Sequence, residues 1–152
     1  MHVRKLPFGD QDAFTGRTAV WTLYALCDGQ GQCQVEDYLC GLLSGPSSEA
    51  ATEMLALLEN IVFDAEGPRR WIGTSRSKES VSGERIFEFK VNSLRVHWFY
   101  GQGQRVAVLA KAVMKKSNTT PKPLATDLKR LKSLYEAAAV ANTIAVVTSQ
   151  GE

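Results

Sequence analysis

The chain has 152 residues, of which 44% are hydrophobic and 22% are charged, with a formal net charge of +2. This ordinary globular mixture favours one domain and excludes disordered, collagen-like and disulfide-scaffold proteins. No apolar run reaches the roughly 20 residues of a membrane span, and residues 1–10 lack the apolar core of a secretory signal. We therefore expect a soluble cytoplasmic protein with no membrane partner. Its single domain should cover residues 1–152, with a core at about 17–140 and peripheral ends at 1–16 and 143–152.

The first half of the chain predicts one strand followed by two helices. Residues 17–26 alternate and are rich in β-branched and aromatic side chains, which is typical of a strand. Apolar residues at helical spacing predict a short helix over residues 35–42. A second helix is capped by Ser47 or Ser48 and ends before Gly67. Both helices are interpreted as core-packing elements without chemistry of their own.

The three cysteines of this half are the candidates for a disulfide or a metal site. They form no CxxC pair, and three cysteines cannot all be paired within one chain. No histidine lies near them in the sequence to complete a zinc site. We therefore interpret them as buried or idle thiols and expect neither a metal nor another cofactor. They are Cys27, Cys33 and Cys40.

The second half predicts an antiparallel meander followed by a helix. Polar residues 73–84 favour a mobile loop. The strand-like runs 85–91, 94–100 and 105–114 are separated by short turn sequences. Thr120 followed by Pro121 favours a helix start, and an amphipathic pattern follows. Residues 143–147 form either an added strand or a frayed tail. The resulting order, β-α-α-β-β-β-α, predicts an α+β fold with an antiparallel-rich sheet packed against helices.

A two-residue hairpin loop at Asn92 and Ser93 fixes the register of the first two meander strands. Glu88 then lies opposite His97, and Lys90 lies opposite Arg95. These four polar residues share one face of the sheet with Ile86 and Phe99. The opposite face packs on helices because its residues are apolar; they are Phe87, Phe89, Val91, Leu94, Val96 and Trp98.

The polar face has the residue types needed to cleave an RNA phosphodiester. Arg95 and Lys90 would hold the charge that develops on the phosphate. His97 or Glu88 would carry protons if its surroundings bring its pKa near neutrality. The alternative is a solvated sheet face with ordinary cross-strand pairs. Lys90 and Arg95 carry like charges directly opposite each other, which is unfavourable unless an anion lies between them. This opposition favours the phosphate-site interpretation.

The charge is concentrated in one half of the chain. Residues 1–67 contain 3 basic and 10 acidic residues, whereas residues 68–135 contain 15 basic and 4 acidic residues. A basic surface attracts polyanions through counterion release. The alternative is a charged, solvated surface. Residues 111–122 add several lysines at the end of the last meander strand and at the helix entry, where they would reach one phosphate backbone.

Several motifs resemble the RelE/ParE/HigB superfamily of toxins, and most closely its phage-derived HigB-like branch. The resemblance rests on the element order, on residues 86–90, 94–100 and 106–116, and on the trailing Thr120-Pro121. It implies a RelE-like fold and a toxin of a type II toxin-antitoxin system. The implied activity is that of a metal-independent endoribonuclease, an mRNA interferase that inhibits translation. The implied partners are an antitoxin, of helix-turn-helix type, and mRNA, often on the ribosome.

Carried over by position, the family's strand lysine corresponds to Lys90, its strand arginine to Arg95, and its basic pair to Lys115 and Lys116. We therefore expect a catalytic set and an RNA-binding set. The catalytic candidates are Arg95, Lys90, His97, Glu88 and Lys116. The RNA-binding candidates are Arg85, Lys111, Lys115 and Lys122.

Two departures from the family pattern support alternatives of another class. The catalytic tyrosine that some members carry after the basic pair has no counterpart, since Lys122 falls near its place. The Asp-Tyr-His ending of some HigB toxins is also absent. The alternatives are a non-catalytic or topoisomerase-targeting (ParE-like) interaction module, or a phage-encoded adaptor. Mapping of mRNA ends after induction distinguishes these hypotheses.

Overall fold

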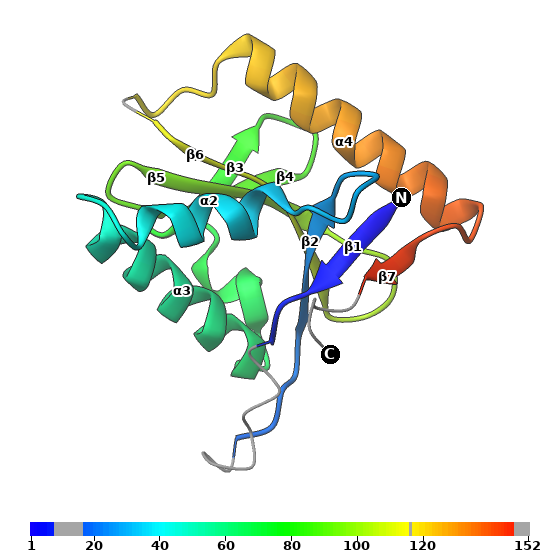
Figure 1. The fold of residues 1–152 in the computed structure, drawn as a ribbon, viewed down its shortest axis with the longest axis horizontal. Helices are drawn as coiled ribbons and strands as arrows, with labels where there is room; N and C mark the ends of the chain where they lie inside the picture. Colours follow the sequence, from blue (N-terminus) through cyan, green and yellow to red (C-terminus); the bar gives the residue numbers. More distant parts are fainter. Residues whose placement is uncertain (8–16, 116, 148–152) are drawn as a thin grey trace.

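The computed structural model describes residues 1–7, 17–115 and 117–147, which form an α+β fold. A mixed seven-stranded sheet has the order β3-β4-β5-β6-β2-β1-β7. Helices α2 and α3 cover one face of this sheet, and α4 covers the other (Figure 1). The strands are β1 (His2–Lys5), β2 (Thr22–Cys27), β3 (Ser77–Val81), β4 (Ile86–Val91), β5 (Leu94–Tyr100), β6 (Val106–Met114) and β7 (Ala145–Val147). The helices are α2 (Gln34–Leu42), α3 (Ser48–Phe63) and α4 (Lys122–Val140), with a 3-10 helix, η2, at Gly67–Trp71.

The predicted meander is confirmed, together with the register of its first two strands. Strands β4, β5 and β6 are antiparallel neighbours, and β6 also pairs in parallel with β2. Glu88 lies opposite His97, and Lys90 lies opposite Arg95. The turn works because Asn92 has a φ of 53°, a left-handed conformation that asparagine tolerates better than most residues. The pairing of β5 with β6 is irregular, because its register shifts between His97 and Trp98.

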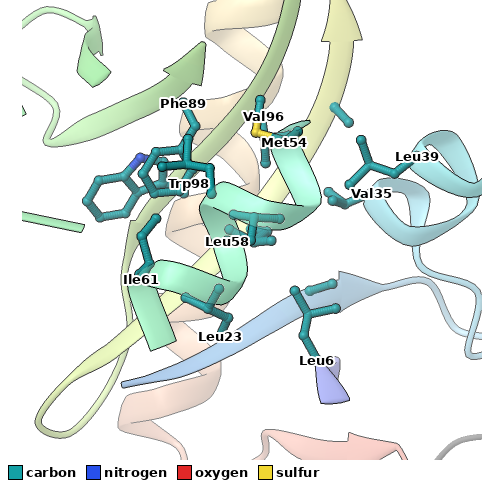
Figure 2. Close-up of a cluster of buried hydrophobic side chains, with 14 of the residues drawn as sticks. Leu6, Leu23, Val35, Leu39, Met54, Leu58, Ile61, Phe89, Val96 and Trp98 are labelled. Carbon is teal, nitrogen blue, oxygen red and sulfur yellow. The ribbon is translucent and has the colours of Figure 1, made fainter. Parts of the chain in front are cut away.

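The predicted apolar face of the hairpin packs on α2 and α3, as expected. Phe89 and Trp98 are completely buried, and their rings stack with centroids 5.0 Å apart. Met54 and Leu58 of α3 reach into the same cluster (Figure 2). Full burial of an apolar side chain of this size stabilises the fold by about 1.5–3 kcal/mol. This cluster therefore fixes which face of the hairpin is left for α4.

Helix α4 packs on the other face through a smaller apolar cluster. Leu128 and Tyr135 of α4 contact a layer that includes Ile86, Phe99 and Val108. The Phe99 and Tyr135 rings meet edge to face, with centroids 5.5 Å apart. This contact covers the half of the β4–β5 hairpin that contains Ile86 and Phe99. The polar residues of the hairpin lie nearer to its turn, beside the start of α4.

Two strands differ from the sequence-based expectations, and a third decides between two alternatives that the sequence left open. Residues 2–5, expected to be peripheral, form β1 between β2 and β7 and bury Val3. Residues 77–81, expected to be part of a mobile loop, form the edge strand β3 on β4. Of the two possibilities for residues 143–147, the structure has the added strand, since residues 145–147 form β7. Strand β3 lies at the edge of the sheet and packs only partly against the core, so most of its residues are polar. Strand prediction from sequence depends on alternating apolar residues, which β3 largely lacks.

The expectation of idle cysteine thiols is wrong for one pair, because Cys27 and Cys33 form a disulfide. Cys27 ends β2, and Cys33 immediately precedes α2. The intervening turn is closed by Asp28, whose carboxylate accepts hydrogen bonds from the backbone N–H groups of Gln30 and Gln32. This turn brings the two cysteine Cα atoms to 4.2 Å. Cys40 is a free, exposed cysteine.

At Gly67, the first residue of η2, the surrounding side chains leave no room for a Cβ atom. Its φ is 59°, and a Cβ atom there would lie 2.3 Å from the Trp21 ring. Gly73 has a φ of 88°, but a Cβ atom there would meet open space. The two glycines therefore separate the cost of backbone strain from the cost of a steric clash.

We predict that Gly67→Ala lowers the free energy of unfolding by about 2–4 kcal/mol, since left-handed strain and overpacking each cost roughly 1–2 kcal/mol or more. Gly73→Ala should cost only the strain, about 1–2 kcal/mol. Urea unfolding of both variants measures the difference. Equal losses in the two variants would show that Trp21 does not constrain this turn.

Candidate functional site

The centre of the polar face is a buried carboxylate held between two cations. Glu88 of β4 is completely buried. Its Oε1 atom accepts a hydrogen bond from Lys115 Nζ at 3.0 Å, and its Oε2 atom lies 3.1 Å from Arg95 Nε. The second contact is an ion pair without the alignment of a hydrogen bond, because neither Oε2 nor Nε has a hydrogen-bond partner among the described residues. We name Glu88, Arg95, Lys115 and His97 the buried charged cluster.

Arg95 is the residue whose placement differs most from the expectation. Its side chain is 4% exposed, and its Nη1 atom donates to the carbonyl oxygens of Asn92 and Leu94. The expected solvent-facing array is therefore wrong for Glu88, Arg95 and His97, which are all buried. The opposition of Lys90 and Arg95 needs no anion between them, because the Arg95 guanidinium lies against Glu88 instead.

His97 completes the cluster as a neutral group. It is completely buried, and its Nδ1 atom lies 3.0 Å from Ser80 Oγ of β3. Burial lowers its pKa to about 4, and the nearby charges of Lys115 and Arg95 add to this effect. His97 is therefore uncharged at pH 7, and its pKa lies well below the value near neutrality that a proton carrier needs.

Lys115 joins the cluster to the segment that connects β6 with α4. Its ammonium group also lies 3.3 Å from Thr120 Oγ1, and its backbone N–H donates to the Ser93 carbonyl oxygen. Because Glu88 holds this ammonium, the carboxylate fixes both the end of β6 and the entry to α4. Two cations share one carboxylate, so the cluster holds an excess positive charge beneath residues 117–121.

Two lysines form the accessible part of this face. Lys78 of β3 donates to the backbone oxygen of Asn118 at 2.9 Å, and Lys90 of β4 donates to its side-chain oxygen at 3.4 Å. Neither ammonium forms an ion pair with a carboxylate of the described residues. Lys78 is exposed and Lys90 is half-buried. We name Lys78, Lys90 and Asn118 the lysine rim.

The other predicted site residues do not lie together in the structure. Lys115 belongs to the buried charged cluster, Lys122 is exposed at the start of α4, and Lys116 lies outside the described residues. Arg85 is exposed, with its guanidinium carbon 5.5 Å from the Tyr100 ring centroid. Strand β4 separates Arg85 from Lys90 by about 17 Å, at ~3.4 Å per residue. Arg85 therefore does not share the site of Lys90.

Lys111 lines a cleft on another part of the surface instead. This cleft has a volume of about 620 Å³ and lies between the β2–α2 turn, β6 and α4. Lys111 Nζ is 2.7 Å from Asp127 Oδ2, and Arg130 Nη2 is 2.6 Å from Asp127 Oδ1. The hydrogen bonds from Lys111 and then Arg130 lower the pKa of Asp127. Both Lys111 and Arg130 are therefore already paired with a carboxylate.

Sequence reasoning missed Lys78 and Asn118. Lys78 belonged to the segment interpreted as a loop, and only its pairing with Glu88 in the register of β3 and β4 places it beside Lys90. One available signal was Ser82-Gly83, a turn-forming pair just before the first meander strand. It indicates a hairpin and hence a preceding strand. No signal of this kind marks Asn118.

No protein-family model matches the chain, and no curated protein is significantly similar to it in sequence. None of the helices formed by the described residues is both long and apolar enough to cross a membrane. Residues 1–7, 17–115 and 117–147 contain no group of three histidine, cysteine, aspartate or glutamate side chains placed to hold a metal ion. The lysine rim offers two ammonium groups, whose chemistry suits an anionic group.

We predict that Glu88→Gln lowers the free energy of unfolding by about 3–5 kcal/mol, because it leaves two buried cations without their shared carboxylate. Urea unfolding measures this loss. The matched control is Glu84→Gln, which changes an exposed glutamate just before β4 and should cost no more than about 0.5 kcal/mol. A Glu88→Gln variant as stable as this control would contradict the central role of the carboxylate.

The His97 pKa predicts a specific pH dependence. Between pH 6.5 and about 4 the unfolded chain binds a proton at His97 that the folded protein excludes. Stability therefore falls as the pH is lowered through this window, by about 3 kcal/mol in total. His97→Gln should flatten this part of the curve, as measured by urea unfolding at pH 7, 5.5 and 4. If the variant and the parent protein lose the same free energy, His97 is not the group responsible.

Proposed function

We propose that this protein is a RelE/HigB-like toxin that acts on RNA and carries the endoribonuclease activity of an mRNA interferase. The order of elements along the chain supports this proposal, because β2, α2, α3, β4, β5 and β6 follow the β-α-α-β-β-β order expected for that superfamily, with α4 after them. Strands β1, β3 and β7 would be additions to that arrangement. An antitoxin partner and a cytoplasmic site of action belong to the same proposal.

The observation that carries the proposal is the lysine rim. Two ammonium groups from adjacent strands converge on Asn118 without a carboxylate partner among the described residues. A phosphodiester backbone attracts such groups and releases counterions when it binds them. The wider segment supports the same partner, since residues 68–135 contain 15 basic residues against 4 acidic ones.

Lys90 is the catalytic candidate that the geometry favours. Of Arg95, Lys90, His97 and Glu88, it is the one that is not buried. In RNA cleavage the 2′-hydroxyl loses its proton to water and its oxygen bonds to the adjacent phosphorus. The bond to the 5′-oxygen breaks, this oxygen takes up a proton from water, and negative charge accumulates on the phosphoryl oxygens in the transition state. A positioned ammonium stabilises that charge. Lys90 would supply it, with Lys78 beside it.

The buried charged cluster would act as a support for this surface. Glu88 and Lys115 hold the end of β6 and the entry to α4, between which Asn118 lies. Site residues keep their geometry when the groups behind them are locked by packing and hydrogen bonds. Arg95 and His97 would thus contribute by positioning, without contact to RNA.

A non-catalytic binding module is the second candidate. The burial of Glu88, Arg95 and His97 favours it, because the described part of the lysine rim contains no histidine or carboxylate to move a proton. Mapping of mRNA ends after induction distinguishes the two functions. New 5′ ends support the endoribonuclease, whereas intact mRNA with a DNA-damage response supports a topoisomerase-targeting module.

We predict that expression of the parent protein arrests growth of a bacterial host and that the Lys78→Gln/Lys90→Gln double variant relieves the arrest. The variant should also lower the slope of log affinity for single-stranded RNA against log salt by about 1.4, the value for two lost phosphate contacts. Its unfolding free energy should change by no more than about 0.5 kcal/mol per site, since both side chains reach solvent. Filter binding at several salt concentrations and growth curves measure these effects.

The matched control is Lys5→Gln. Lys5 is exposed at the end of β1, which lies four strands away from β4 in the sheet order. This variant should retain the growth arrest and the parent salt slope. A parent protein that permits normal growth, or a double variant that remains fully toxic, would contradict the proposed function.

A further inference from the structure

A second cationic surface lies at the end of β4 opposite the lysine rim. Tyr100 ends β5, and Arg85 immediately precedes β4. The Arg85 guanidinium carbon lies 5.5 Å from the Tyr100 ring centroid. Arg69 of η2 lies over Trp21, with its guanidinium carbon 5.6 Å from that ring, and the Trp21 and Tyr100 ring centroids are 6.2 Å apart. We name Arg69, Arg85 and Tyr100 the arginine–tyrosine patch.

The two arginines of this patch have no carboxylate partner. Neither guanidinium forms an ion pair with a carboxylate of the described residues. The Glu79 carboxylate instead accepts hydrogen bonds from the backbone N–H groups of Gly83 and Arg85. Arg69 Nε donates to the Glu66 carbonyl oxygen at 3.3 Å. Both arginine side chains are exposed, and a guanidinium has five N–H donors, so each retains donors for a ligand.

Tyr100 adds a hydroxyl group that can donate. Its ring meets those of Phe87 and Trp98 edge to face, with centroids 5.8 Å and 5.0 Å away. Burial raises the pKa of the Tyr100 hydroxyl, and the nearby charges of Arg69 and Arg85 oppose this effect. The hydroxyl therefore stays protonated at neutral pH. It has no hydrogen-bond partner among the described residues, so its proton is available to a ligand.

The accessible chemistry of the patch is that of charge and hydrogen bonding. The rings beneath the arginines are buried, since Trp21 is 5% exposed and Phe87 is 7% exposed. Protein partners are held mainly by buried aromatic and apolar contacts at the centre of an interface, whereas a nucleic-acid strand is held mainly through its phosphates. The patch therefore suits a nucleic-acid strand better than an acidic protein. The large apolar side chains that are exposed among the described residues lie elsewhere: Leu43, Met114, Leu134, Val140 and Val146.

We propose that the arginine–tyrosine patch is a second contact surface for single-stranded RNA. The guanidinium groups of Arg69 and Arg85 hold its phosphates, and the Tyr100 hydroxyl donates a hydrogen bond to a phosphoryl oxygen. A guanidinium stacked on an aromatic ring has a restricted orientation, and its planar array of donors matches the oxygens of a phosphate.

The patch and the lysine rim are separate surfaces. Tyr100 shares one face of the sheet with Trp98, two residues earlier in β5, whereas Lys90 belongs to the opposite face with Glu88. Substitutions in the two surfaces should therefore act independently, as is usual for distant sites. The inference rests on the proposed function in one respect: the polyanion is taken to be RNA.

The test is filter binding of the full chain to a single-stranded oligoribonucleotide at several salt concentrations. Arg69→Gln/Arg85→Gln should reduce the steepness of log affinity against log salt by about 1.4, the value for two lost phosphate contacts. Arg69→Lys/Arg85→Lys should retain the parent slope but bind more weakly, because an ammonium keeps the charge and loses the planar donors. Tyr100→Phe should weaken binding about tenfold, since a hydrogen bond to a charged group is lost.

The matched control is Arg130→Gln. Arg130 is exposed like the arginines of the patch, but its guanidinium pairs with Asp127. This variant should retain the parent affinity and slope. NMR spectra of the ¹⁵N-labelled parent chain report the contact directly, because the Nε–H signals of Arg69 and Arg85 should shift in a saturable manner with the oligoribonucleotide. Urea unfolding of each variant shows that its fold is retained.

Parent affinity and slope in the Arg69→Gln/Arg85→Gln variant would overturn the inference. Shifts of the two arginine signals with a polyglutamate peptide but not with the oligoribonucleotide would also overturn it and assign the patch to an acidic protein. If the Lys78→Gln/Lys90→Gln variant still lost RNA binding and growth arrest in either case, the proposed function would stand without this patch. RNA binding that depends on the patch, in a protein that does not arrest growth, would support the patch and contradict the proposed function.

Discussion

The arrangement of the polar face depends on one ion-paired carboxylate. Glu88 lies under the sheet surface with Arg95 on one oxygen and Lys115 on the other. Removal of one partner from a buried ion pair is costly because the remaining charge is left without compensation. The carboxylate therefore restrains three segments at once: the β4–β5 hairpin, the end of β6 and the entry to α4.

This restraint divides the basic residues into two groups with different consequences. The cations nearest Glu88 are paired with its carboxylate in the interior, whereas Lys78 and Lys90 remain at the surface beside Asn118.

The sequence predicted the hairpin well because alternation and a two-residue turn determine register. Glu88, Lys90, Arg95 and His97 lie on one face as expected. Their burial was not predictable, because it depends on residues 117–121 and on β3, whose polar sequences carry no periodic signal. Ser80 illustrates the point, since a serine in a supposed loop becomes the partner of His97. The sequence thus identified the residues of the polar face but did not predict which of them are buried.

The most direct test of this account is to map the RNA contact surface on the folded protein. We would titrate the uniformly ¹⁵N-labelled chain with a single-stranded oligoribonucleotide and follow its backbone amides. The account predicts early, saturable shifts at Lys78, Lys90 and Asn118, with small shifts at Arg95 and His97 beneath them. Shifts concentrated on α2 and α3, or strongest at Arg95 and His97, would contradict it.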